Sequence, residues 1–169
     1  MKKTALIFLV LLFTLPVLAQ KKKLTHNEVL QRKNSIILTL GGNGIFLSLS
    51  YDRVLAAKPG FFVDANVGLG FIPMTGGTSF SHQLVFNLGK RTGFLMLGVG
   101  GTYLWSKSDA SVCTKAKTSY HLSPIVGWKK IFRSHLLFTV YASPLIPVYA
   151  RGCYNPVIPY GGASFGYTF

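Results

Sequence analysis

The chain has 169 residues, of which 49% are hydrophobic and only 13% are charged, whereas an ordinary soluble domain carries about 25% charged residues. This length holds one domain and hardly two, and the high hydrophobic content excludes intrinsic disorder. The formal net charge is +14, but no basic stripe with interleaved aromatic residues occurs, so nucleic acid is not an expected partner.

The first 19 residues have the features of an export signal. Lys2 and Lys3 precede an apolar run of 15 residues that ends at Ala19, which is typical of a cleaved secretory signal. A membrane-anchoring helix is the alternative, but 15 residues at about 1.5 Å each are shorter than a hydrocarbon core of roughly 30 Å. We expect cleavage near Ala19/Gln20 and a mature chain outside the cytoplasm.

Residues 20–34 are polar and predict a periplasmic lead-in to which the sequence assigns no function. Beyond them, apolar and polar residues alternate with a period of two, which predicts β-strands with one apolar and one polar face. In the stretch 61–71, for example, Val63, Val67 and Leu69 oppose Asp64 and Asn66. The expected strands cover about 35–41, 44–54, 61–71, 79–88, 93–105, 119–129, 135–144 and 158–169.

The connections between these strands alternate in length. The second, fourth and sixth are short, while the third, fifth and seventh are longer, and the fifth and seventh (106–118 and 145–157) each have 13 residues. Outer-membrane barrels show this parity, with short periplasmic turns and long external loops. The first connection, Gly-Asn at 42–43, is the exception and predicts a tight hairpin.

A sheet that crosses a membrane must satisfy all its backbone hydrogen bonds internally, so it has to close. We therefore predict an all-β fold for residues 35–169: a closed antiparallel eight-stranded transmembrane β-barrel with up-and-down meander topology. Side chains largely fill a lumen of this width, so no open pore is expected. The inward polar side chains should pair with one another, because unpaired burial is costly. They are Asp52, Asp64, Asn66, Gln83, Asn87, His121 and Lys129.

Aromatic residues fall at both ends of the predicted strands, which is typical of the aromatic belts of a spanning barrel. The expected periplasmic belt contains Tyr51, Phe61, Trp128, Tyr167 and Phe169. The expected external belt contains Phe71, Tyr103, Trp105 and Tyr120. Core aromatics of a soluble β-protein are the alternative interpretation.

The two cysteines, Cys113 and Cys153, lie in the two longest connections. Outside the cytoplasm an even pair indicates a disulfide, which would join two loops on the external side. Two free thiols or a pair of metal ligands are the alternatives, and no His/Cys cluster with metal spacing supports the latter. We expect no metal and no cofactor.

His121 and Ser123 raise the main catalytic hypothesis, whereas His82, on an apolar face, is expected to be an interfacial residue. Over three residues, their His-x-Ser pattern resembles the motif of outer-membrane lipid A deacylases. In that family the pair faces lipid and an acidic residue orients the His. Here the alternation turns both side chains inward, and the chain has no Asp or Glu after residue 109. The sequence therefore predicts no catalytic residue.

The signal sequence, the alternating strands, the loop parity and the terminal ASFGYTF together resemble the small eight-stranded outer-membrane β-barrel proteins of Gram-negative bacteria, the OmpX- or OmpA-like, porin-like barrels. The resemblance implies that the barrel-assembly machinery binds the last strand during biogenesis. The positions that fit this assembly signal are Tyr160, Phe165, Tyr167 and Phe169.

The predicted function is that of a non-enzymatic, monomeric, multi-pass protein of the cell outer membrane. It would contact lipid along its sides and act structurally or through its external loops on a partner that the sequence does not identify. Two alternatives remain: a secreted or periplasmic soluble β-barrel that binds an apolar ligand, and a lipid-modifying enzyme of the lipid A deacylase type. Fold alone does not decide among them.

Overall fold

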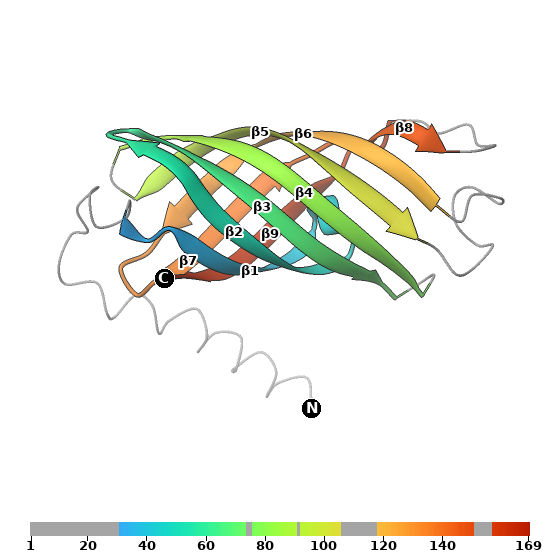
Figure 1. The fold of residues 1–169 in the computed structure, drawn as a ribbon, viewed down its shortest axis with the longest axis horizontal. Coiled ribbons are helices and arrows are strands. Elements are labelled where there is room, and N and C mark those ends of the chain that lie inside the picture. Colours follow the sequence, from blue (N-terminus) through green and yellow to red (C-terminus); the bar gives the residue numbers. More distant parts are fainter. Residues whose placement is uncertain (1–30, 74–75, 91, 106–117, 151–156) are drawn as a thin grey trace, which may run out of the picture.

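The computed structural model describes residues 31–73, 76–90, 92–105, 118–150 and 157–169. They form a single antiparallel sheet that closes on itself, because β5 pairs with β4 on one side and with β6 on the other (Figure 1). The strand segments are β1 (Asn34–Gly41), β2 (Leu47–Lys58), β3 (Phe61–Ile72), β4 (Gly77–Leu88), β5 (Gly93–Trp105), β6 (Thr118–Ile131), β7 (Leu136–Ala142), β8 (Ile146–Ala150) and β9 (Gly161–Thr168).

The nine segments make eight barrel strands, because β7 and β8 are two parts of one. Both pair with β6, β7 along residues 126–131 and β8 along residues 119–122. Prolines lie at the break between β7 and β8 and lack the N–H group that a strand donates to its neighbour. They are Pro124 in β6 and, on the β7–β8 side, Pro144 and Pro147. The predicted closed eight-stranded antiparallel barrel is confirmed. The seventh connection is shorter than expected, since β8 occupies part of the predicted loop 145–157.

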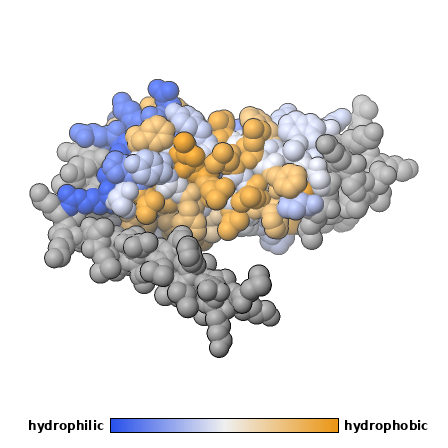
Figure 2. Space-filling model, turned by 90° about the horizontal axis from the view of Figure 1, so that it is seen from below, coloured by the Kyte–Doolittle hydropathy of each residue, from blue (hydrophilic) through white to orange (hydrophobic). Residues whose placement is uncertain are grey.

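The two faces of the sheet have opposite character. In β3, the buried Phe62, Asp64 and Asn66 alternate with neighbours that point outward, and Leu69 is 68% exposed. Figure 2 shows the result on one side of the molecule, where hydrophobic residues cover the middle of the barrel. The outside is therefore apolar, and much of the inside is polar.

The barrel has two distinct ends. At one end, here called the turn end, lie the short connections after β2, β4 and β6 and the start and finish of the sheet, where Asn34 and Phe169 exchange backbone hydrogen bonds of 3.0 and 2.8 Å. The opposite end, called the loop end, carries the connections after β1, β3, β5 and β8. In the described ranges, no helix combines the length and the apolarity needed to cross a membrane.

The first connection is not the tight Gly-Asn hairpin that the sequence predicts. Instead, the chain passes through a short 3-10 turn, η1 (Gly42–Gly44), and residue Ile45 with a φ of 73° before β2 begins. The turn folds into the barrel, where the carbonyl of Gly44 accepts a 3.0 Å hydrogen bond from the Ser79 hydroxyl of β4. The hairpin prediction was wrong because these glycines serve packing inside the lumen rather than a two-residue turn.

Gly42 allows this inward path in two ways. Its φ is +66°, in the left-handed region that favours glycine, and a Cβ at this position would overlap the hydroxyl of Tyr141 from β7. Gly76, between β3 and β4, has a similar φ of +60°, but a Cβ added there would meet no other atom within 4 Å. The two glycines therefore differ in surroundings and not in backbone conformation.

We predict that Gly42→Ala destabilises the barrel more than Gly76→Ala. Both substitutions incur about 1 kcal/mol for the left-handed backbone, and Gly42→Ala adds roughly 1–3 kcal/mol for overpacking against Tyr141. The measurement is chemical unfolding of the two purified variants followed by circular dichroism. Equal losses in the two variants would show that η1 does not pack in the lumen as described.

Candidate functional site

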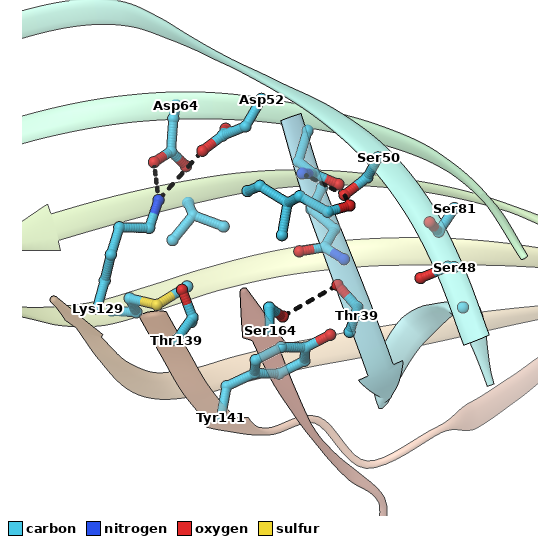
Figure 3. A pocket seen from close by; sticks show the side chains of 16 residues that line it. Thr39, Ser48, Ser50, Asp52, Asp64, Ser81, Lys129, Thr139, Tyr141 and Ser164 are labelled. Carbon is cyan, nitrogen blue, oxygen red and sulfur yellow. Dashed lines mark hydrogen bonds and ion pairs between the residues drawn. The ribbon is translucent and has the colours of Figure 1, made fainter. Parts of the chain in front are cut away.

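The most polar feature of the described structure is a buried group in the lumen, here called the lumen charge cluster: Asp52, Asp64, Asn87 and Lys129. The Lys129 ammonium lies 3.2 Å from Oδ2 of Asp52 and also contacts Oδ2 of Asp64 (Figure 3). Asn87 donates to the same Asp64 oxygen over 2.9 Å. All four residues are at most 4% exposed, so β2, β3, β4 and β6 are connected through the interior.

The lumen charge cluster contains two carboxylates and one ammonium group. Removing the lysine would leave two buried anions close together, and an unpaired buried charge costs several kcal/mol. Oδ1 of Asp52 and Oδ1 of Asp64 have no hydrogen-bond partner among the described residues. Both acids border a polar cavity of about 30 Å³, which is the size of one or two water molecules.

Small polar side chains form most of the remaining cavity wall, and its other large side chains are Ile37, Val85, Met96 and Tyr141. Asn66 donates to Ser50 over 3.2 Å, and the hydroxyls of Thr39 and Ser164 lie 3.0 Å apart, which links β1 to β9. Gln83 lines the same cavity. Of the seven lumen residues expected from the sequence, the structure thus places Asp52, Asp64, Asn87 and Lys129 in one cluster and Asn66 and Gln83 beside it.

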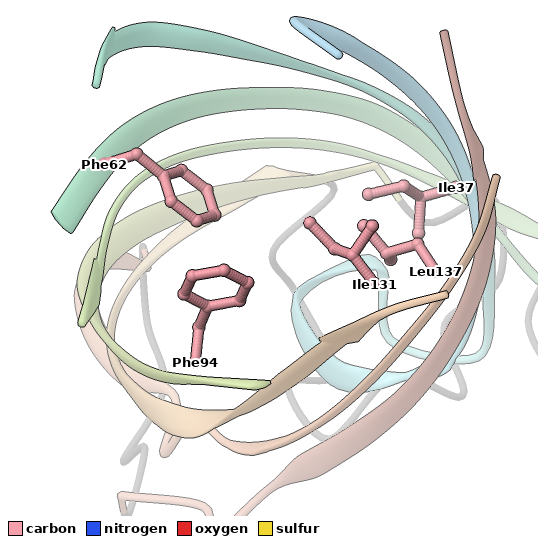
Figure 4. Packing of buried hydrophobic residues seen from close by; sticks show 5 residues of the cluster. All are labelled: Ile37, Phe62, Phe94, Ile131 and Leu137. Atoms are coloured by element: carbon pink, nitrogen blue, oxygen red, sulfur yellow. The ribbon is translucent and has the colours of Figure 1, made fainter. Parts of the chain in front are cut away.

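Hydrophobic side chains fill the lumen at the turn end. Figure 4 shows this cluster, which consists of Ile37, Phe62, Phe94, Ile131 and Leu137. The rings of Phe62 and Phe94 meet edge to face with centroids 4.9 Å apart, and the Lys129 ammonium lies 5.6 Å from the Phe62 centroid. The cavity of about 30 Å³ is bordered by Gly44 of η1 and by Ile37 of this cluster.

His121 and Ser123, the pair considered for catalysis, both lie on the inner wall of β6. His121 is 8% exposed and Ser123 is fully buried, so neither faces the outer surface. The acidic side chains in the described ranges are Asp52 and Asp64, and both are bound to Lys129. The same ranges contain no group of three His, Cys, Asp or Glu residues that could hold a metal ion.

The outer surface carries aromatic rings near both ends of the strands. At the turn end, Tyr51, Trp128, Tyr167 and Phe169 are exposed and Phe61 is partly buried. At the loop end, Phe71, Tyr103 and Trp105 are exposed and Tyr120 is partly buried. Tyr120 lies across β5 toward His82 of β4, with its hydroxyl 3.3 Å from Nε2. This arrangement pairs two polar groups on an otherwise apolar face.

The aromatic residues of the last strand have two different environments. Phe165, Tyr167 and Phe169 are each about half exposed on the outside, and Phe165 packs on Phe138 of β7 with centroids 4.9 Å apart. Tyr160, which precedes β9, instead donates a hydrogen bond to the carbonyl of Ile45 and so holds the η1 connection. Partial burial raises the pKa of Tyr160.

Several residues singled out by the sequence lie outside the described ranges. They are Cys113, Cys153 and the whole export signal with most of the polar lead-in that follows it. Sequence reasoning, for its part, missed the hydrophobic cluster at the turn end as a unit. Phe62 and Phe94 both occupy inward positions in the alternating pattern of the predicted strands. Two large inward aromatic residues near the same end of the barrel were the sequence signal that could have predicted this cluster.

Comparison with known proteins shows a likeness in fold. No family model and no curated protein matches the sequence. The crystal structure of the N-terminal β-barrel domain of OprF from Pseudomonas aeruginosa is similar, with a TM-score of 0.55 and 9% sequence identity over 81% of this chain and 96% of that one. At this identity the likeness shows a shared barrel fold and leaves activity open.

We predict that Lys129→Met destabilises the protein by about 3–5 kcal/mol, because it leaves Asp52 and Asp64 buried without a cation. The triple variant Asp52→Asn, Asp64→Asn, Lys129→Met should recover most of this loss, since the isolated charges are gone. Chemical unfolding of the three proteins measures both effects. If the triple variant were no more stable than Lys129→Met, charge pairing would not be the source of the stability.

Proposed function

We propose that the chain is an integral outer-membrane protein whose barrel spans the bilayer and presents its longer connections on the external side. The observation that carries the proposal is the apolar outer surface, to which every barrel strand contributes. Large hydrophobic side chains that are more than a third exposed occur on β1 through β9. A continuous surface of this kind is unfavourable in water and is matched by hydrocarbon.

The polarity of the lumen argues against the first alternative. A soluble barrel that binds an apolar ligand needs an apolar inner wall. Here the cavity is lined mostly by polar side chains, and the lumen charge cluster borders it. A cavity of about 30 Å³ is also far smaller than a ligand pocket, which occupies roughly 300–1,000 Å³.

The proposed role is structural or interactive rather than enzymatic. An enzyme acting on membrane lipid needs its nucleophile and base on a surface that lipid can reach. His121 and Ser123 are buried on the inner wall, which supports a non-enzymatic function. A partner would then be bound by the external connections, and the proposed disulfide between Cys113 and Cys153 would restrain the two longest of them.

We further propose that the last strand is bound by the barrel-assembly machinery through its outward aromatics, Phe165, Tyr167 and Phe169. Their exposure on one face of β9 would make them accessible before the strand joins β1. Cell fractionation of the full-length protein tests the proposed location: a heat-modifiable band in the outer-membrane fraction is the expected result, and a detergent-free soluble monomer would overturn it.

We predict that Leu38→Arg and Leu55→Arg lower the free energy of unfolding by different amounts only if lipid surrounds the barrel. Leu38 is 49% exposed in the middle of β1, between Leu49 and Phe165, whereas Leu55 is 59% exposed near the turn end of β2. In a bilayer the first substitution should cost roughly 2–4 kcal/mol and the second about 0–1 kcal/mol. Urea unfolding in phospholipid vesicles measures both, and equal small costs would favour a water-exposed surface.

We also predict that deletion of Phe169 lowers the outer-membrane level of the protein more than Phe165→Leu does. Deletion removes the Phe169 ring and the two backbone hydrogen bonds between Phe169 and Asn34, while Phe165→Leu keeps an apolar side chain against Phe138. Quantitative immunoblotting of membrane fractions provides the measurement. Unchanged levels after the deletion would argue against a role for Phe169 in assembly.

A further inference from the structure

Outside the lumen, the charged side chains that the structure describes are all basic. In the described ranges the acidic side chains are Asp52 and Asp64, and both are buried with Lys129. The other charged side chains are basic and lie at or near the turn end, here called the turn-end collar. They are Arg32, Lys33, Arg53, Lys58, Lys90, Lys130 and Arg133.

The collar surrounds the barrel instead of forming one patch. Lys33 precedes β1, Lys58 ends β2, Lys90 lies between β4 and β5, Lys130 is near the end of β6, and Arg133 follows β6. These elements are distributed around the closed sheet. Figure 2 shows hydrophilic residues of this end next to the apolar surface. A ring of positive charge fits a surrounding anionic layer better than a compact ligand or a linear polyanion.

The collar directly borders the aromatic rim at the turn end. Lys130 lies two residues from Trp128 on the outer side of β6, with its ammonium 6.0 Å from the Trp128 ring centroid. Trp128 is 45% exposed, and tryptophan at the edge of an apolar belt lies at the headgroup level of a bilayer. In a barrel that spans a bilayer, this position puts the lysine ammonium at the level of the lipid phosphates.

One member of the collar has a structural task as well. The Arg32 guanidinium donates to the carbonyls of Phe132 and Arg133 over 3.0 and 3.1 Å, which fastens the segment before β1 to the turn after β6. Lys90 and Lys130 are more suitable for testing the collar, since no described carboxylate side chain outside the lumen is available to either. Like charges gathered at one end repel one another, and a nearby anionic layer removes that penalty.

We propose that the turn-end collar binds anionic phospholipid headgroups and gives the barrel a preference for such lipids in the leaflet at its turn end. The proposal rests on the proposed membrane function, because only a spanning barrel brings the collar to the headgroup layer. Each basic side chain close to an anionic membrane surface contributes an attraction equivalent to about a fivefold change in binding.

The chain contains two tryptophans, and they report on opposite ends. Trp128 lies at the turn end beside Lys130, and Trp105 ends β5 at the loop end. The variant Trp105→Phe leaves only Trp128, and Trp128→Phe leaves only Trp105. Fluorescence quenching by brominated phosphatidylglycerol, compared with brominated phosphatidylcholine, in mixed vesicles then measures the lipid preference at each end.

We expect Trp128 to favour the anionic lipid about fivefold, and Trp105 reports separately on the lipid at the opposite end. High salt should abolish the preference, because it screens these exposed charges. Lys90→Gln with Lys130→Gln, made in the Trp105→Phe background, should also abolish it. The charge-matched control, Lys115→Gln with Lys117→Gln from the connection after β5, should leave it unchanged.

The outcomes separate the two proposals. Failure to form a heat-modifiable barrel in either kind of vesicle would contradict the membrane function itself. Insertion with equal quenching by the two lipids, or a preference that survives high salt, would overturn the collar proposal alone. If Lys90→Gln with Lys130→Gln prevented insertion, the salt dependence of the Trp105→Phe protein would still decide. Binding of a duplex oligonucleotide, lost in that variant and without lipid preference, would instead identify a nucleic-acid surface.

Discussion

Closure of the sheet is the constraint on which the rest of the structure depends. Each strand finds hydrogen-bonding partners on both sides, including the pairing of β1 with β9 that brings the first and last strands together. Only a closed sheet can place apolar side chains all around its outer face without an exposed edge of backbone groups. Closure in turn creates a narrow interior, and polar side chains placed there must be satisfied by one another. The lumen charge cluster and the small hydroxyl pairs are the means by which this sequence does so.

The barrel could be predicted from the sequence because its main signal is local. Alternation with a period of two fixes which side chains share a face, and it placed Asp64, Asn66 and Lys129 inward without any knowledge of their partners. The interior arrangement could not be predicted in the same way. Contact between Lys129 and Asp52 depends on strands that are 77 residues apart along the chain, and the strand register that joins them is a property of the closed sheet.

The observed structure differs from the sequence prediction at two places, for different reasons. The Gly-Asn pair at 42–43 suggested a tight turn, yet the connection enters the lumen, where Gly42 lies against Tyr141. The strand after Ser143 was missed because Pro144 and Pro147 weaken the strand signal, although a proline-containing segment can still pair where no N–H is required. In both cases the glycines or prolines were noticed in the sequence, but their structural role depends on neighbouring strands that the sequence pattern does not show.

The lumen charge cluster also affects which strand register the barrel can adopt. If β6 slipped by one residue relative to β5, each of its side chains would move to the opposite face. Lys129 would then face outward and Trp128 inward, so a single misalignment would lose the ion pairs and force an indole into an interior already filled by side chains. The ion pairs between β6 and the β2–β3 hairpin can therefore form in only one strand register. The cluster disfavours misaligned barrels in addition to stabilising the correct one.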